Sequence, residues 1–145
     1  MCSKHLQASG AGGTEIEVFL TRYLAVLMCA SFEEAIEGLV DTRSLKSKDE
    51  AVASFVRSSM DLVFRSLKSS EIGGLLGRFG AEQKRCFQEE MKKDQRAETL
   101  FNNIVTSRHH TAHATGSDLT FAELVQFYSE GHVVLDAVKL ALERA

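Results

Sequence analysis

Apolar residues recur every three to four positions along most of the chain, which is the spacing of one face of an α-helix. The first such stretch covers about residues 15–41 and is apolar on nearly every side at residues 26–30. A helix with that composition needs cover on every side, so we expect it to be central. Ser31 and Glu34 have the spacing of a helix cap, but the apolar period continues past them to Val40. We therefore expect one long helix.

Two helices are expected next, over about 49–68 and, in a shorter segment, over about 71–79. The glycines of the shorter segment weaken it as a helix and suit close packing. The apolar period of the longer one predicts that seven side chains point inward: Val52, Phe55, Val56, Met60, Val63, Phe64 and Leu67.

The second half of the chain predicts two more helical stretches. Residues 81–107 have helical spacing, with a break or kink expected at residues 92–96, where no apolar residue occurs. Thr120 and Glu123 have the spacing of a capping box, which predicts the start of the last helix, about residues 121–142. Apolar residues repeat there every seven positions, as in the narrow seam of a bundle helix: Phe121, Tyr128, Leu135 and Leu142.

These patterns predict an all-α fold, an antiparallel helical bundle of about five helices. The chain has 145 residues and no proline, and no stretch shows the alternation of a β-hairpin. We expect residues 1–13, which are small, polar and glycine-rich, to be a disordered N-terminal tail, and residues 14–145 to form one domain. No apolar run is long enough to cross a membrane. Three scattered cysteines indicate reduced thiols and a cytoplasmic protein.

Charge is unevenly distributed, although the net charge is only −3. Residues 14–41 hold six acids and one base, whereas residues 78–113 hold seven bases and five acids. A phosphate-facing surface would therefore be local and built from the second half of the chain. Solvated helix faces of mixed charge account for the same residues more simply.

The most distinctive stretch is the hexapeptide from Arg108 to His113, which contains three of the five histidines of the chain. It lies where the helix ending near residue 107 should meet a turn at residues 114–118. Arginine is a permanent cation with a planar set of donors, and histidine exchanges a proton near neutral pH. This combination indicates chemistry on an anionic group.

Helix geometry limits how these side chains can act together. On a continuous helix, Arg108 and His113 would be about 140° apart, so either the helix ends before His113 or the arginine reaches round it. His109 and His113 would share a face of the helix. His109 is therefore a candidate hydrogen-bond donor to phosphate or a second proton carrier. Alternatively, His109 and His110 are polar residues at a helix end. Glu33 is either a surface carboxylate or a group that orients an arginine or histidine.

Taken together, the residues resemble the HEPN superfamily of small all-α domains. The signature of that family is an arginine, four to six residues, then a histidine, late in the chain; here Arg108 precedes His113 by four intervening residues. The resemblance extends to Ser31–Ile36 in the first helix and to Leu119–Leu124 before the last, and covers about residues 15–142. Two short stretches match one prokaryotic subgroup more weakly: Phe55-Val56-Arg57 and Leu76-Gly77-Arg78-Phe79-Gly80. Where many members have asparagine and glycine, this chain has His109 and Ala114.

The resemblance implies metal-independent cleavage of RNA by a homodimer, with Arg108 and His113 as catalytic residues and no cofactor or metal. RNA carries its own nucleophile, the 2′-hydroxyl group, so cleavage needs a base, an acid and a positive charge beside the phosphorane. A two-fold dimer would supply a second copy of His113. His109 and Glu33 are the supporting candidates. An antitoxin or a defence-system protein is a candidate partner.

Three alternatives remain on sequence grounds. His109 and His113 have the i, i+4 spacing that a zinc site can use, although no cysteine lies nearby. A non-catalytic HEPN-like module would use its bundle for dimerisation or partner binding. In the third alternative, the histidines merely end a helix.

Overall fold

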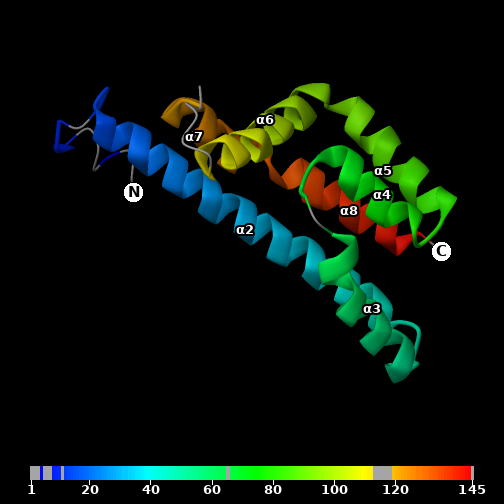
Figure 1. Cartoon of the computed structure of the whole chain (residues 1–145). Helices are drawn as coiled ribbons and strands as arrows, with labels where there is room; N and C mark the ends of the chain where they lie inside the picture. The colour runs from blue at the N-terminus through cyan, green and yellow to red at the C-terminus, as the bar shows by residue number, and fades with distance from the viewer. Residues whose placement is uncertain (1–3, 5–7, 11, 65, 113–118, 145) are drawn as a thin grey trace.

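The computed structural model describes residues 4, 8–10, 12–64, 66–112 and 119–144, and for residues 109–112 it describes the backbone only. The described part of the chain is helical and contains no strand, as the sequence predicted (Figure 1). In chain order the helices are α2 (Glu15–Leu45), α3 (Glu50–Val63), α4 (Ser69–Gly77), α5 (Ala81–Lys93), α6 (Gln95–Ala112), α7 (Phe121–Glu130) and α8 (His132–Glu143).

Helix α2 is the long central helix. It runs without a break through Ser31 to Leu45, four residues beyond the predicted end. Figure 1 shows α3 beside its C-terminal end and α6 and α7 beside its N-terminal half, and α8 also packs against it. The face that receives these helices is buried at Ala25, Cys29 and Ile36.

Helix α3 ends at Val63, five residues earlier than predicted, and Phe64 after it has extended backbone. The prediction that all its apolar residues point inward is wrong for two of them, because Val52 is 46% and Phe55 71% exposed. Helix α3 packs mainly against α2, so only one of its sides is covered. Which apolar positions are buried is decided here by the neighbouring helix and not by the period.

The predicted break within residues 92–96 is confirmed at Asp94, which separates α5 from α6. The Asp94 carboxylate accepts a hydrogen bond of 2.9 Å from the backbone N–H of Ala97 and so caps the first turn of α6. Helix α6 then continues to Ala112, past the predicted end at residue 107. Arg108 is therefore a helical residue.

The last helix is divided at Gly131 into α7 and α8, so the prediction of one helix over residues 121–142 is wrong. The turn moves residues of the expected seam to different sides, and Tyr128 is 74% exposed. The predicted capping box is confirmed. Thr120 Oγ1 accepts from the N–H of Glu123 at 3.2 Å, and the Glu123 carboxylate accepts from the N–H of Thr120 at 2.8 Å.

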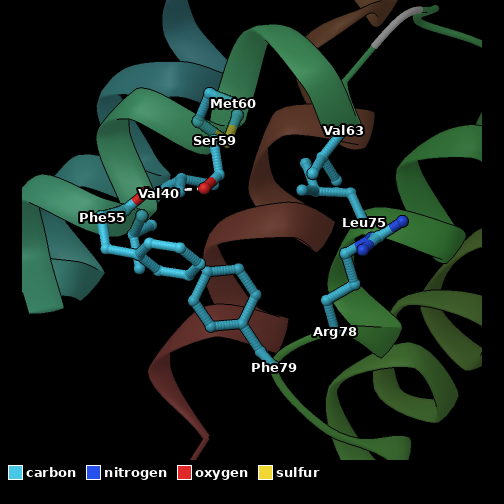
Figure 2. A pocket seen from close by; sticks show the side chains of 9 residues that line it. Val40, Phe55, Ser59, Met60, Val63, Leu75, Arg78 and Phe79 are labelled. Carbon is cyan, nitrogen blue, oxygen red and sulfur yellow. Dashed lines mark hydrogen bonds between the residues drawn. The ribbon is translucent and has the colours of Figure 1, made fainter.

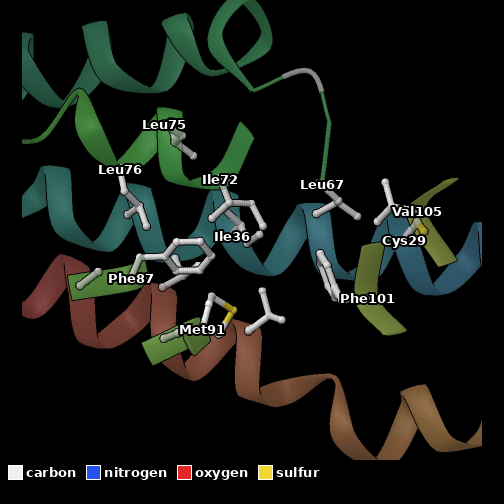
Figure 3. Close-up of a cluster of buried hydrophobic side chains, with 14 of the residues drawn as sticks. Cys29, Ile36, Leu67, Ile72, Leu75, Leu76, Phe87, Met91, Phe101 and Val105 are labelled. Atoms are coloured by element: carbon white, nitrogen blue, oxygen red, sulfur yellow. The ribbon is translucent and has the colours of Figure 1, made fainter. Parts of the chain in front are cut away.

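A shared core joins the helices, with buried side chains from α2, α4, α5 and α6 meeting in Figure 3. Toward α7 the core contains three phenylalanine rings, Phe32, Phe101 and Phe127, whose centroids lie 5.1 to 5.6 Å apart. A Cβ atom at Gly131 would lie 2.8 Å from both the Phe127 carbonyl oxygen and Phe32 Cζ. Glycine is therefore required for α7 to turn this close to α2.

Candidate functional site

An ion pair between Arg108 and Glu33 is the centre of the candidate site. Arg108 Nη1 donates a hydrogen bond of 2.7 Å to Glu33 Oε1, which joins the last third of α6 to the middle of α2. The two side chains are 23% and 30% exposed, so the pair is partly shielded yet open to solvent. A guanidinium has five N–H donors, and the group can bond a second anion while Glu33 holds it.

Phe32, next to Glu33 in the sequence, explains why the carboxylate is well placed. The Phe32 ring packs edge to face against Phe101, with centroids 5.4 Å apart. This contact fixes the separation and rotation of α2 and α6 close to the ion pair. The carboxylate is thus held by the hydrophobic core rather than by a flexible loop.

Cys29, one turn before Glu33, is buried against the pair. Burial raises the pKa of the Cys29 thiol to about 11; the positive charge of Arg108 opposes this shift and the negative charge of Glu33 adds to it. At neutral pH the thiol is therefore protonated and a poor nucleophile. Cys29 acts as a small apolar side chain at the floor of the site.

Of the four site residues predicted from the sequence, Arg108 and Glu33 are brought together. The side chain of His109 and the whole of His113 lie outside the described residues, as does the side chain of His110. The backbone of α6 carries positions 109–112 onward from Arg108 as regular helix. The roles of both histidines thus remain predictions.

Asn102 is a residue that the sequence did not single out. Its side-chain oxygen accepts from the N–H of Ser69 and its amide nitrogen donates to Ser69 Oγ, each at 3.0 Å. These bonds attach the start of α4 to α6, about two turns before Arg108. The only local signal was the Ser69-Ser70 pair, which suits the start of a helix.

The basic residues predicted to form a phosphate-facing surface are partly neutralised along α5. Arg85 pairs with Glu82 at 2.6 Å, and Lys93 pairs with Glu90 at 2.6 Å. The pair with Arg85 also lowers the pKa of Glu82. This side of α5 is a mixed-charge face, so the alternative to a basic patch holds there.

The two short stretches that resemble one subgroup meet at a cavity between α3, α4 and the C-terminal part of α2 (Figure 2). Its volume is about 240 Å³, and it is lined by Val40, Phe55, Val56, Ser59, Met60, Val63, Leu75, Arg78 and Phe79. Ligand pockets are usually larger, roughly 300 to 1,000 Å³. With no carboxylate or imidazole in the lining, this cavity is not the candidate for proton-transfer chemistry.

Within the described parts of the chain, no three histidine, cysteine or acidic side chains gather as a metal site would require. The alternative zinc pair, His109 and His113, falls outside those parts. None of the described helices has the combination of length and apolar composition needed to span a membrane.

One protein-family model matches the chain over almost its full length. Residues 1–144 match the model of the RiboL-PSP-HEPN family. The chain belongs to that family. Its HEPN domain is all-α, in agreement with the resemblance inferred from Arg108, His113 and the first helix. No curated protein and no solved structure matches the chain.

In this HEPN domain the arginine of the signature lies one turn before the last described residue of α6 and is clamped by α2. The first-helix stretch that contributed to the resemblance, Ser31–Ile36, contains the clamping residue, Glu33. Two parts of the sequence that suggested the family separately therefore meet at one place in the fold.

Proposed function

We propose that this HEPN domain is a metal-independent endoribonuclease that works as a homodimer. The observation that carries the proposal is the Arg108–Glu33 pair, which holds the guanidinium of the family signature at a partly open position at the end of α6. A guanidinium kept in place before the substrate arrives can stabilise charge that develops on a phosphate without reorganising.

The chemistry follows from the substrate and the signature. One His113 would take the proton of a 2′-hydroxyl group as its oxygen attacks the neighbouring phosphorus. Arg108 would bind the non-bridging oxygens, on which negative charge accumulates. The bond from phosphorus to the 5′-oxygen breaks, and the leaving oxygen takes a proton from a second imidazole. The products would be a 2′,3′-cyclic phosphate and a 5′-hydroxyl end. His109 would support the reaction as a second proton carrier or as a hydrogen-bond donor to the phosphate.

The second imidazole is the reason for proposing a dimer. An exposed apolar stripe runs along the N-terminal half of α2 through Ile16, Phe19, Tyr23, Val26 and Leu27, which are 40% to 74% exposed. Such a continuous apolar face on one helix is typical of an interaction surface. By helix register, Phe19 and Val26 lie within about 60° of the line through Glu33, so a partner seated on the stripe would lie beside the site.

The experiment compares RNA with RNA in which every 2′-hydroxyl is replaced by hydrogen, both incubated in EDTA. The proposal predicts cleavage of the first and none of the second, with cyclic phosphate ends detected by mass spectrometry. Cleavage that disappears in EDTA, or that also occurs on the deoxy strand, contradicts it.

The second candidate is a non-catalytic dimerisation or partner-binding module, and the exposed stripe on α2 also supports this function. Under either function, the partner would be a second copy together with an antitoxin or defence-system protein in the cytoplasm. Stable dimers that leave every tested RNA intact would favour the module.

A further inference from the structure

We propose that Arg22 is a second RNA-binding arginine, which contacts a phosphate about two or three nucleotides from the one that is cleaved. This inference rests on the proposed nuclease function and adds a substrate contact from α2. It starts from the fact that Arg22 is the one base among residues 14–41, a stretch that also holds six acids.

The position of Arg22 on α2 is the first observation. Arg22, Cys29 and Glu33 are separated by seven and four residues, so their Cα atoms lie within about 40° of one another around the helix axis. Cys29 and Glu33 both face Arg108. Arg22 therefore extends the line of the candidate site by about three helical turns toward the N-terminus of α2.

The direction of α6 places Arg22 near the motif. Phe32 contacts Phe101, whereas Cys29, closer to the start of α2, feels the charge of Arg108. The two helices therefore run in opposite directions, as Figure 1 shows. The end of α6 at Ala112 points along α2 toward the turn that holds Arg22. A strand bound at Arg108 could follow this line and meet Arg22.

The surroundings of Arg22 are the third observation. Its Nε atom is buried and has no hydrogen-bond partner among the residues that the structure describes, while the residue as a whole is only half-buried. The positions three and four residues away on the same helix are all apolar: Val18, Phe19, Ala25 and Val26. No carboxylate on α2 can therefore form the usual i, i+3 or i, i+4 ion pair with Arg22.

A phosphate diester suits this arrangement better than a carboxylate of the protein. The two Nη groups of a guanidinium present planar donors that match two phosphate oxygens. The buried Nε atom has no partner among the described residues, so no carboxylate there neutralises the guanidinium through it, and its charge is available to an anion that reaches the exposed part of the side chain. Because Arg22 is about three turns, or roughly 16 Å, from Glu33 along the helix axis, its phosphate would lie about two or three nucleotides from the scissile phosphate held by Arg108.

The test measures binding separately from cleavage. The probe is a fluorescent 2′-O-methyl oligoribonucleotide whose unmodified form wild-type protein is shown to cut; it lacks the nucleophile and cannot be cleaved. Anisotropy titrations over a range of salt concentrations compare wild type with Arg22→Ala, Arg22→Lys and Arg43→Ala. Arg43 is the matched control, since it is also half-buried on α2 and lies 21 residues, or about 31 Å, away.

The proposal predicts that Arg22→Ala weakens binding about 10-fold and reduces the slope of log affinity against log salt by about 0.7, the share of one phosphate contact. Arg22→Lys should keep the slope and lose only part of the affinity, and Arg43→Ala should match wild type. Circular dichroism melting checks that each variant is folded. If Arg22→Ala impairs folding, the affinity and salt slope of Arg22→Lys are compared with wild type instead.

Two failures are distinguishable. If wild type cuts RNA and Arg22→Ala binds the probe with unchanged affinity and slope, the role of Arg22 is wrong while the nuclease function stands. If wild type neither binds nor cuts RNA, the proposed function fails and the role of Arg22 fails with it.

Discussion

Glu33 and Arg108 are 75 residues apart in the chain, and their side chains meet at 2.7 Å between Oε1 and Nη1. This contact connects the middle of the central helix to the arginine of the HEPN signature. A partly exposed ion pair contributes little to folding, about 0 to 1 kcal/mol. We therefore interpret Glu33 as a positioning residue for Arg108, which explains an acid at the edge of a mostly apolar helix face.

Removing the Glu33 carboxylate should impair RNA cleavage without unfolding the domain. Glu33→Ala is expected to lower kcat about 10- to 100-fold, because Arg108 loses its orientation, with a smaller effect on KM. Glu33→Gln, which keeps a hydrogen-bond acceptor, should recover part of the loss. The neighbouring exposed residue supplies the control, and Glu34→Ala should cleave at the wild-type rate. Equal kcat values for Glu33→Ala and Glu34→Ala would remove Glu33 from the site.

Any side chain at Gly131 should destabilise the folded domain. In Gly131→Ala the new methyl group would lie 2.8 Å from Phe32 Cζ and from the Phe127 carbonyl oxygen, so the aromatic cluster must shift. We expect a loss of about 1 to 3 kcal/mol in the free energy of unfolding, measured by urea denaturation. Gly38 on α2 has open space around it, and Gly38→Ala should stabilise by about 0.5 to 1 kcal/mol. Equal stability of wild type and Gly131→Ala would show that α7 can move away.

Cys29 should make the domain less stable at high pH. Burial raises its pKa from 9.0 to about 11, so between these values the thiol ionises in the unfolded chain but keeps its proton in the folded one. The unfolded state then binds fewer protons, and stability must fall as pH rises through this window, by about 2 to 3 kcal/mol in total. Denaturation curves at pH 8.5 and 11 should show this loss in wild type and in Cys86→Ala. The loss should be smaller by that amount in Cys29→Ala, and an identical pH dependence in all three proteins would refute the assignment.

The apolar stripe on α2 should be the surface of the dimer. Phe19 is 74% exposed, and Phe19→Glu places a charge in the middle of the stripe. Sedimentation should show wild type at twice the 16.0 kDa chain mass and Phe19→Glu as a monomer without nuclease activity. Leu45, 58% exposed at the far end of the same helix, provides the control, and Leu45→Glu should remain dimeric. If wild type is monomeric and still cleaves RNA, a second imidazole from a partner subunit is not needed for cleavage.

Local pattern predicted those features of the fold that depend on local chemistry. The continuous apolar period through Ser31 predicted one long α2, and the absence of apolar residues around Asp94 predicted the break between α5 and α6. The break at Gly131 escaped prediction because apolar residues keep their period on both sides of it. The close approach of Gly131 to Phe32, which lies about 100 residues earlier in the chain, is also invisible in the local pattern.

In the candidate site, too, the sequence identified single residues but not the contacts between them. Arg108 was found from its spacing to His113, and Glu33 was a candidate as a carboxylate that could orient an arginine or histidine. Their contact depends on how α2 and α6 cross, which the pairing of Phe32 with Phe101 fixes and which no local pattern specifies. The sequence marked Arg22 only as the one base among residues 14–41, and its unpaired Nε becomes evident only when the surrounding helices are in place.

The measurement that tests the central claim most directly is the rate of RNA cleavage in EDTA by wild type, Arg108→Ala and His113→Ala, with Arg43→Ala as the matched arginine control. We predict that wild type and Arg43→Ala cleave at similar rates and that loss of Arg108 or of His113 lowers the rate at least about 100-fold, in line with the loss of an electrostatic or proton-transfer group. Cleavage at the wild-type rate by Arg108→Ala or His113→Ala would contradict the account.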